Sequence, residues 1–387
     1  MMQARHRAVV GRKKDEFEMA SLMPAVRGML RKGVGFLLQQ ASSGYSESIH
    51  YMCLPRITNG VWEDICYPTD FFPRMLVLDS LLDSREFDSR ITEGLVQKEI
   101  EYIRASKHQT VNGGWNYIPS FPDLPPDADD LALVLQLLFR SGGKKEASIC
   151  DGALEVLSKY NLRDDGSIST WVIDLEDTSE SNMAVLRYST FLLGAPALVP
   201  GGGGADVDVL SNLLYALALY DAKKYMPVLR KGAHYLETHQ QPEGYWESRW
   251  YWGPYYATFK STCFLSLLSR PGAVRPAIEF IVDTQLEDGG WGENMKSSDD
   301  LNTALALMSL LSSNVLSDST ARAITKGAGY LWRAANADGS WRNVRLERTV
   351  TSRRCMSYGS QTTTTSFCVK ALAGIRKRAE GYGQRSI

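Results

Sequence analysis

The sequence predicts an all-α protein, an α/α barrel of six helical hairpins, and two observations support this fold class. A short turn of the form acid or amide, glycine, any residue, aromatic recurs six times along the 387 residues. An amphipathic segment precedes each turn and a more uniformly apolar segment follows it, so each repeat is expected to form one pair of helices. Because stacked pairs bury one continuous core, we expect two concentric rings with the apolar helices inside.

The six turns share a glycine at the second position and, with one exception, an aromatic residue at the fourth. They lie at residues 59–62, 112–115, 165–168, 243–246, 288–291 and 338–341, and Ile168 is the exception. A glutamine stands six residues before three of the tryptophans, whereas Ala335 takes this place before the last one. We interpret the turn tryptophans as stacked structural residues; they are Trp62, Trp115, Trp246, Trp291 and Trp341, and the glutamines are Gln109, Gln240 and Gln285.

The inner helices are predicted where an apolar run begins on polar capping residues. They cover residues 69–82, 129–138, 208–219, 256–268, 298–311 and 360–374. The amphipathic partners include residues 228–240 and 275–285, whose apolar residues recur at three- and four-residue spacing. All six inner helices would point the same way, so the loops before them would gather at one end of the barrel, where chemistry is expected.

Composition and charge limit the classes of partner. A hydrophobic content of 44% can fill a large core, and a net charge of -1 argues against nucleic acid. No run approaches the roughly 18 apolar residues that span a bilayer. We expect a flexible tail over residues 1–21, one barrel over residues 22–376 and a second tail over residues 377–387, in a monomer or homodimer. The glycine-rich segment 194–204 is expected to be a loop, with a lid or a peripheral membrane contact as the alternative.

The spacing of the cysteines indicates the cellular compartment. Their wide spacing, without any CxxC pair, fits buried free thiols in a reducing environment better than a disulfide framework. A cytoplasmic location is therefore expected. The six residues are Cys53, Cys66, Cys150, Cys263, Cys355 and Cys368.

The stretch "PPDADDLALVLQLL" places Asp127, Asp129 and Asp130 directly before the second inner helix. One aspartate is enough to cap a helix, and the chain repeats this device at Asp299 and Asp300. Three close carboxylates have a further consequence, because repulsion between like charges keeps at least one of them protonated. The cluster is thus either a helix cap or a strong acid at the mouth of a cavity.

This DxDD motif, together with the glutamine-tryptophan turns, resembles the squalene-hopene cyclase and oxidosqualene cyclase family of class II terpene cyclases. The similarity runs from about Gly60 to Gly374. Squalene-type members have two barrels in about twice this length, and this chain is similar to the barrel that carries DxDD. Two features depart from the family pattern: Leu131 stands where a threonine usually follows DxDD, and "RNVRLERTVTSRRCMSYGSQTTTTS" replaces an aromatic-rich C-terminal segment.

The resemblance implies a role for each acid. Asp129 would donate the proton that starts a carbocation cascade, and Asp127 and Asp130 would tune and orient it. A histidine on the next inner helix often contacts the donor in the family, and its place falls on Asn212. An amide can form this hydrogen bond but carries no charge.

Aromatic residues in the loops before the inner helices are expected to stabilise cations, at about 0.5 to 2 kcal/mol each. Trp250 matches a cavity position of the family. The predicted substrate-binding set is Trp115, Tyr117, Phe121, Trp171, Trp250, Trp252 and Tyr256. We expect no cofactor, with Mg²⁺ as an alternative if the substrate is a diphosphate. Glu176, Asp177 and Glu180 are the weak candidate for such a metal site, and a solvated acidic loop is the other interpretation.

The sequence thus predicts a class II terpene cyclase that acts on a linear or partly cyclised isoprenoid or meroterpenoid, a small-molecule substrate. The competing interpretation is a barrel without this activity that binds a lipid or a protein, because a fold alone does not determine function.

Overall fold

The computed structural model describes residues 2–58, 61–84, 89–109, 112–193, 206–315, 317–350 and 355–381. The chain folds into two compact units, each built from separate stretches of sequence. Unit 1 comprises Met1–Gly44, Asp79–Ser89 and Gln240–Ile387. Unit 2 comprises Tyr45–Leu78 and Arg90–His239. The two ends of the chain therefore belong to the same unit.

Unit 2 combines a β-hairpin with helices of the first half of the chain. Strands β1 (His50–Thr58) and β2 (Val61–Thr69) pair antiparallel. Helices α4 and α7 pack against each other. The helical elements are η1 (Ser46–Ser48), the first part of α2 (Phe71–Asp83), α3 (Ser89–Ala105), α4 (Ala128–Ala147), η2 (Ser148–Cys150), α5 (Asp151–Val156), the π-turn η3 (Leu157–Asn161), α6 (Glu180–Leu193) and α7 (Val207–Thr238).

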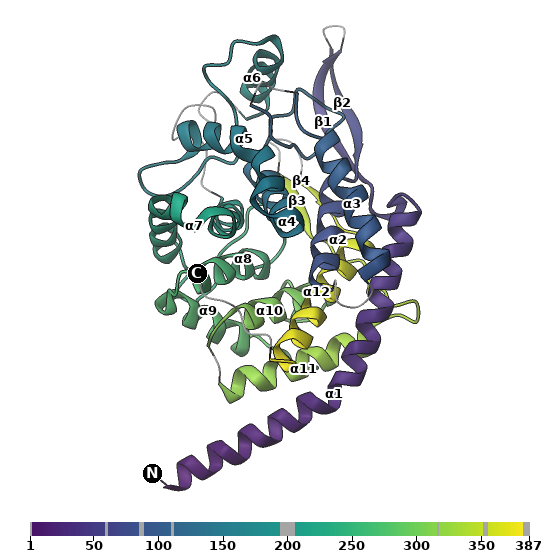
Figure 1. Cartoon of the computed structure of the whole chain (residues 1–387), viewed down its shortest axis with the longest axis vertical. Helices are drawn as coiled ribbons and strands as arrows, with labels where there is room; N and C mark the ends of the chain where they lie inside the picture. Colours follow the sequence, from purple (N-terminus) through teal and green to yellow (C-terminus); the bar gives the residue numbers. More distant parts are fainter. Residues whose placement is uncertain are drawn as a thin grey trace. The chain divides into compact units, whose positions relative to one another are not determined.

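Unit 1 joins the N-terminal helix to the last helices of the chain. Helix α1 lies beside α11 and α12 (Figure 1). Strands β3 and β4 form an antiparallel hairpin between α11 and α12. The elements are α1 (Met2–Ser42), α8 (Tyr255–Leu267), α9 (Pro271–Asp283), α10 (Asp300–Ser312), α11 (Asp318–Ala334), β3 (Glu347–Val350), β4 (Cys355–Tyr358) and α12 (Gln361–Ala379).

Helices form over all six predicted inner segments, which confirms them. They are α2, α4, the first part of α7, α8, α10 and α12. Polar side chains cap several of them as expected: Asp299 Oδ1 accepts the amide of Asn302 at 2.8 Å, and Ser360 Oγ accepts that of Thr363 at 3.0 Å. Twelve of the thirteen residues of α10 are buried, as a helix surrounded by other helices requires.

Helix α7 contains two of the predicted segments in one continuous element. The apolar segment 208–219 and the amphipathic segment 228–240 meet near Asp221, whose backbone is not helical (φ -156°, ψ 79°). A kink at this residue lets one long element serve as an inner and then an outer helix. No loop separates them, although the change from an apolar to an amphipathic pattern suggested two separate helices.

The aromatic turns share one construction. The indole N–H of Trp115, Trp291 and Trp341 donates to a carbonyl near the end of the preceding outer helix at 2.7, 2.7 and 2.9 Å. Ile168 occupies the same buried place in its turn. Gly166 has φ +90°, and an added Cβ there would lie 2.3 Å from the Lys231 carbonyl oxygen. These tryptophans are therefore structural, as predicted.

The glutamines of the turns join neighbouring repeats. Gln240 Nε2 donates to the carbonyls of Gly244 and Ala273 at 2.6 and 2.9 Å, and Gln285 bonds Gly289 and Ala323 in the same way. Gln109 differs from these two glutamines in that it is exposed. The turn of Trp115 is longer, and Lys107 Nζ instead donates to the carbonyl of Ile149 at 3.2 Å.

The first predicted turn is wrong. Val61 and Trp62 begin strand β2, and Trp62 pairs with Ile57 across the hairpin. Asn59 and Gly60 lie outside the described residues, but Asn-Gly between two β-rich segments is a strong hairpin signal that the repeat pattern concealed.

The hairpin also corrects the prediction that all six cysteines are free thiols. Cys53 and Cys66 lie directly opposite each other in the β1–β2 ladder and form a disulfide. Their separation of 13 residues looked unrelated in the sequence because the hairpin was not recognised. The other cysteines are free.

The predicted tails differ from the structure. Helix α1 starts at Met2, where we expected a flexible tail up to residue 21, and α12 continues to Ala379 beyond the expected boundary at residue 376. Residues 2–20 are rich in alanine, arginine, lysine and methionine, which favour helix. Residues 382–387 and the segment 194–204 lie outside the described residues. Within the described part of the chain, no helix has the length and hydropathy needed to cross a bilayer.

Candidate active site

The acid motif begins where backbone hydrogen bonds hold the chain on two sides. The amide of Asp127 donates to the carbonyl of Trp115 at 3.0 Å. On the other side, Ala128 N donates to Thr170 O at 2.7 Å and Val172 N donates to Pro126 O at 2.8 Å. Asp127 and Trp171 form an antiparallel bridge between these bonds. The start of α4 is therefore fixed by two separate loops of unit 2.

Asp127 is the N-cap of α4. Its backbone is extended (φ -127°, ψ 161°), and its Oδ1 accepts the amides of Asp129 at 2.9 Å and Asp130 at 2.8 Å. These amides belong to the first turn, which has no earlier helical carbonyls to bond. Asp129 and Asp130 consequently lie at the positive end of the helix, which stabilises a carboxylate left after proton loss.

All three acids are buried, with exposed fractions of 8%, 9% and 2% for Asp127, Asp129 and Asp130. Burial raises the pKa of Asp127 to about 7, with the negative charge of Asp129 adding to the effect. Hydrogen bonds from the backbone and the carboxyl group of Asp130 act in the opposite direction. Burial and repulsion between the acids thus favour a protonated carboxyl group inside the motif, whereas a solvent-exposed helix cap lacks both effects.

Asn212 contacts Asp129, as the resemblance implied. Its Nδ2 lies 2.6 Å from Asp129 Oδ1 and 3.5 Å from the Asp129 backbone oxygen. The Oδ1 of Asn212 accepts a hydrogen bond from Gln136 Nε2 at 2.9 Å. Asn212 is fully buried and Gln136 is 4% exposed. The packed faces of α4 and α7 thus carry a continuous chain of two amides and one acid.

Sequence reasoning missed Gln136. A signal was present, because "LALVLQLL" has one polar residue in an apolar run, and a buried amide requires hydrogen-bond partners. Thr170 was missed as well. It joins the loop beside Asp127 to the start of α7 through a hydrogen bond from its Oγ1 to Asp206 Oδ2 at 2.6 Å.

The predicted aromatic residues of unit 2 differ in their surroundings. Trp171 is next to the acids through its bridge to Asp127. Trp115 is completely buried in its turn, so the structure favours its structural role over a place in the substrate-binding set. Tyr117 bonds His50 Nδ1 through its hydroxyl at 2.8 Å, and Phe121 stacks on Tyr67 with ring centroids 4.5 Å apart.

The remaining aromatic candidates, Trp250, Trp252 and Tyr256, belong to unit 1. Trp252 has the guanidinium of Arg345 4.0 Å from its ring centroid, and its indole N–H donates to Ser357 Oγ at 3.1 Å. Tyr256 stacks on Tyr251 with centroids 3.5 Å apart. The carbonyl of Trp250 accepts the amide of Arg348 at 2.8 Å, which ties this loop to strand β3.

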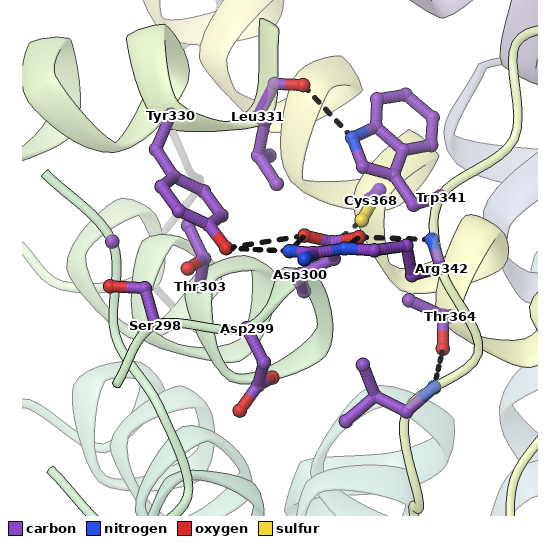
Figure 2. Close-up of polar contacts among 12 residues, drawn as sticks. Ser298, Asp299, Asp300, Thr303, Tyr330, Leu331, Trp341, Arg342, Thr364 and Cys368 are labelled. Atoms are coloured by element: carbon purple, nitrogen blue, oxygen red, sulfur yellow. Dashed lines mark hydrogen bonds and ion pairs between the residues drawn. The ribbon is translucent and has the colours of Figure 1, made fainter. Parts of the chain in front are cut away.

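The acids at the start of α10 in unit 1 form a different arrangement, which Figure 2 shows. Asp300 is completely buried, and its carboxylate bonds the guanidinium of Arg342 at 2.7 and 3.1 Å and the hydroxyl of Tyr330 at 3.3 Å. Asp299 caps the helix. In α10 the second acid is thus neutralised by an arginine, whereas Asp129 in α4 bonds a neutral amide.

The weak candidate for a metal site is wrong. The structure describes Glu176, Asp177 and Glu180 and does not bring them together, and no group of three or more potential metal ligands occurs among the described residues. Glu176 pairs with Lys159 at 2.6 Å, and Asp177 Oδ1 accepts the amide of Ser179 at 2.8 Å. The acidic segment is therefore a loop that leads into α6.

The chain is similar in sequence to squalene-hopene cyclases and to copalyl diphosphate synthases. The squalene-hopene cyclase of Zymomonas mobilis is 26% identical over 254 residues, covering 59% of this chain and 36% of its own length. The copalyl diphosphate synthase of Streptomyces anulatus is 34% identical over 149 residues, covering 35% and 26%. The chain thus spans about a third or less of the length of these curated relatives.

Solved structures agree on the fold. The type II terpene cyclase MstE from Scytonema aligns with a TM-score of 0.65 at 17% identity, over 92% of this chain and 99% of that one. The ent-copalyl diphosphate synthase from Streptomyces platensis aligns with a TM-score of 0.55 at 22% identity, over 81% and 52%. The predicted fold class, an all-α toroid of helical hairpins, is confirmed. Residues 95–377 match the family model of the squalene-hopene cyclase C-terminal domain, and the chain belongs to this family.

Proposed function

We propose that the chain is a class II terpene cyclase that starts a carbocation cascade by protonating its substrate. The observation that carries this proposal is the buried acid cluster, with Asp127 capping α4 and Asp129 bonded to a neutral amide. An alkene is a very weak base, so its protonation needs a strong acid held at the reacting carbon. Burial, the clustering of three carboxyl groups and the helix N-terminus together supply such an acid.

Each residue has a defined part in the reaction. The carboxyl O–H of Asp129 gives its proton to a terminal alkene or epoxide, and a new C–H or O–H bond leaves a carbocation and the Asp129 carboxylate. Asp127 and Asp130 tune the acidity of Asp129 and orient its carboxyl group. The cation then closes rings by attack of further double bonds and ends by losing a proton or capturing water.

The substrate class is an isoprenoid or meroterpenoid. Relatives are named for squalene and for copalyl diphosphate, and a structural neighbour is described in complex with geranylgeranyl dihydroxybenzoate. We propose that Tyr117, Phe121 and Trp171 contribute aromatic faces, with Trp250, Trp252 and Tyr256 as further candidates. Protonation by Asp129 uses no cofactor, and Mg²⁺ would serve only a diphosphate head group.

The test uses the purified full chain with a panel of polyprenyl alkenes, epoxides, diphosphates and prenylated benzoates in D₂O. From an alkene, wild type should release cyclic product with one deuterium at the initiating carbon, detected by mass spectrometry; from an epoxide the deuterium is on an exchangeable hydroxyl, so ring formation itself is the readout. Asp129→Asn should lower the rate at least about 100-fold, the lower end of what a positioned general acid contributes. Asp299→Asn, a matched change in the cap of α10, should leave activity intact.

Equal product from wild type and Asp129→Asn would remove Asp129 as the donor. Cyclic product from an alkene without deuterium would point to ionisation instead of protonation. If the folded wild type binds prenyl chains but converts none of them, the competing interpretation holds, and the chain is a lipid-binding barrel.

A further inference from the structure

We propose that Gln136 is a positioning residue that fixes the orientation of the Asn212 amide and so assigns the acidic proton of Asp129 to Oδ2. This inference rests on the proposed function of Asp129 as the proton donor. The oxygen and nitrogen of a side-chain amide are nearly indistinguishable in shape, so only hydrogen-bond partners determine which end faces the acid.

A backbone carbonyl determines the orientation of Gln136. Its Nε2 lies 3.0 Å from the carbonyl oxygen of Ala132, one turn earlier in α4. A carbonyl only accepts hydrogen bonds, so the NH₂ group of Gln136 must face this oxygen. The second N–H of the same group points at Asn212 Oδ1, 2.9 Å away.

The orientation of Asn212 follows from this bond. With its oxygen held by Gln136, Asn212 presents Nδ2 to Asp129 Oδ1 at 2.6 Å. The Asp129 backbone oxygen, 3.5 Å from the same nitrogen, is a second acceptor on this side. Two backbone carbonyls, one at each end of the amide pair, therefore impose the same direction on both amides.

The orientation of Asn212 determines which oxygen of Asp129 carries the acidic proton. Asp129 Oδ1 accepts from Asn212, so the proton of the neutral carboxyl group is on Oδ2, the oxygen that faces away from the amide. After proton transfer, the Asn212 N–H stabilises the new carboxylate without a change in its own charge. Side-chain amides do not relay protons through this pair, so Asp129 must regain its proton on the Oδ2 side.

A double-mutant cycle tests the role of Gln136. Gln136→Met keeps the side-chain volume but removes the donor, which frees the Asn212 amide to rotate. We expect kcat to fall about tenfold, the effect of one hydrogen bond in the transition state, with KM nearly unchanged. In an Asn212→Leu background, the same change should have no further effect, because the amide that Gln136 orients is absent.

A matched control is Gln285→Met in unit 1, where the glutamine also bonds two acceptors but only joins a turn to the next helix. This variant should lower Tm and leave kcat unchanged. If Gln136→Met keeps full kcat, or if it lowers kcat equally in both backgrounds, Gln136 does not act through Asn212 and the inference is wrong.

A second measurement does not need a substrate. Neutron diffraction from deuterated crystals of the whole chain, grown at acidic pH, should place deuterium on Asp129 Oδ2 and on Asn212 Nδ2. Deuterium on Asp129 Oδ1 would overturn the assignment. The proposed function fails separately, when Asp129→Asn is as active as wild type.

Discussion

Two aspartates of this chain occupy equivalent caps and differ in what surrounds the acid that follows. Asp127 and Asp299 both accept backbone amides at the start of an inner helix. Beyond the cap, Asp300 forms an ion pair with Arg342, whereas Asp129 bonds the amide of Asn212. The two acids also differ in position, because Asp300 directly follows its cap whereas Asp129 is the second residue after its own, so they lie on different faces of their helices.

The raised pKa of Asp127 predicts how stability depends on pH. The folded protein holds this proton up to pH about 7, whereas the unfolded chain releases it near 3.8. Between these values the folded state binds more protons, so the free energy of unfolding must fall as pH rises. The shift corresponds to at most ~4 kcal/mol.

Asp127→Asn removes this titration and keeps a good N-cap residue. Urea unfolding of wild type and variant at pH 5, 6, 7 and 8 should show the variant gaining stability relative to wild type up to pH about 7 and no further. A stability difference that stays constant across this range would mean that Asp127 is ionised in the folded protein.

At the scale of the element, a threonine hydroxyl fixes three of the aromatic turns to their inner helices. Oγ1 of Thr258, Thr303 and Thr365 accepts the backbone amide of Trp246, Trp291 and Trp341 at 3.1, 2.9 and 3.1 Å. Thr258 and Thr303 stand four residues after their caps and Thr365 five after its own, whereas Leu131 stands four residues after the cap of α4. Because leucine replaces threonine after the acid motif, α4 lacks at this position the hydroxyl that accepts the turn amide in these repeats of unit 1.

Thr303→Val should destabilise the protein by about 1 to 3 kcal/mol, because the Trp291 amide is buried and loses its acceptor. The same substitution at Thr325 is the control. Its hydroxyl only donates to the Ala321 carbonyl within α11, so Thr325→Val should change stability by less than about 0.5 kcal/mol. Chemical denaturation measures both variants, and equal losses would contradict the hydrogen bond.

At the scale of the molecule, the start of the chain packs against the last repeat, which consists of α11, the turn of Trp341 and α12. Helix α1 packs on α11 and α12, and Gly33 sits against the last turn. A Cβ at Gly33 would lie 2.6 Å from Val369 Cγ2 and 3.2 Å from Trp341 Cζ3. Helix α1 therefore takes the place of the outer helix that follows this repeat: an added Cβ at Gly339 would lie 2.6 Å from the Lys32 carbonyl oxygen, as one at Gly289 would lie 2.6 Å from that of Lys326 in α11.

Gly33→Ala and Gly35→Ala should have opposite effects on stability. Alanine in a helix is favoured over glycine by up to about 1 kcal/mol, and at Gly35 the added methyl group has no atom within 4 Å. At Gly33 the methyl group would overlap buried Val369, which costs about 1 to 3 kcal/mol. Thermal unfolding should show a higher Tm than wild type for Gly35→Ala and a lower Tm for Gly33→Ala. A higher Tm for both variants would contradict this packing of α1.

Much of the fold could be predicted because its signals are local. Apolar runs, caps and glycine turns lie within a few residues of each other, and they located all six inner helices and the place of Asp127. The first turn was misassigned because Asn59-Gly60-Val61-Trp62 satisfies two local patterns, a repeat turn and a hairpin. Only pairing with residues 50–57 distinguishes them, and that pairing also forms the Cys53–Cys66 disulfide.

The sequence by itself determined the repeating helices, the acid cap and, through the family pattern, the meeting of Asn212 with Asp129. The tertiary structure decided what those residues do to one another. Asp129 and Asn212 are 83 residues apart, and Gln136 and Asn212 are 76 apart. Whether a carboxyl group is buried, and which end of an amide faces it, depends on the packing of α4 against α7, because solvation and hydrogen-bond direction are properties of the assembled site.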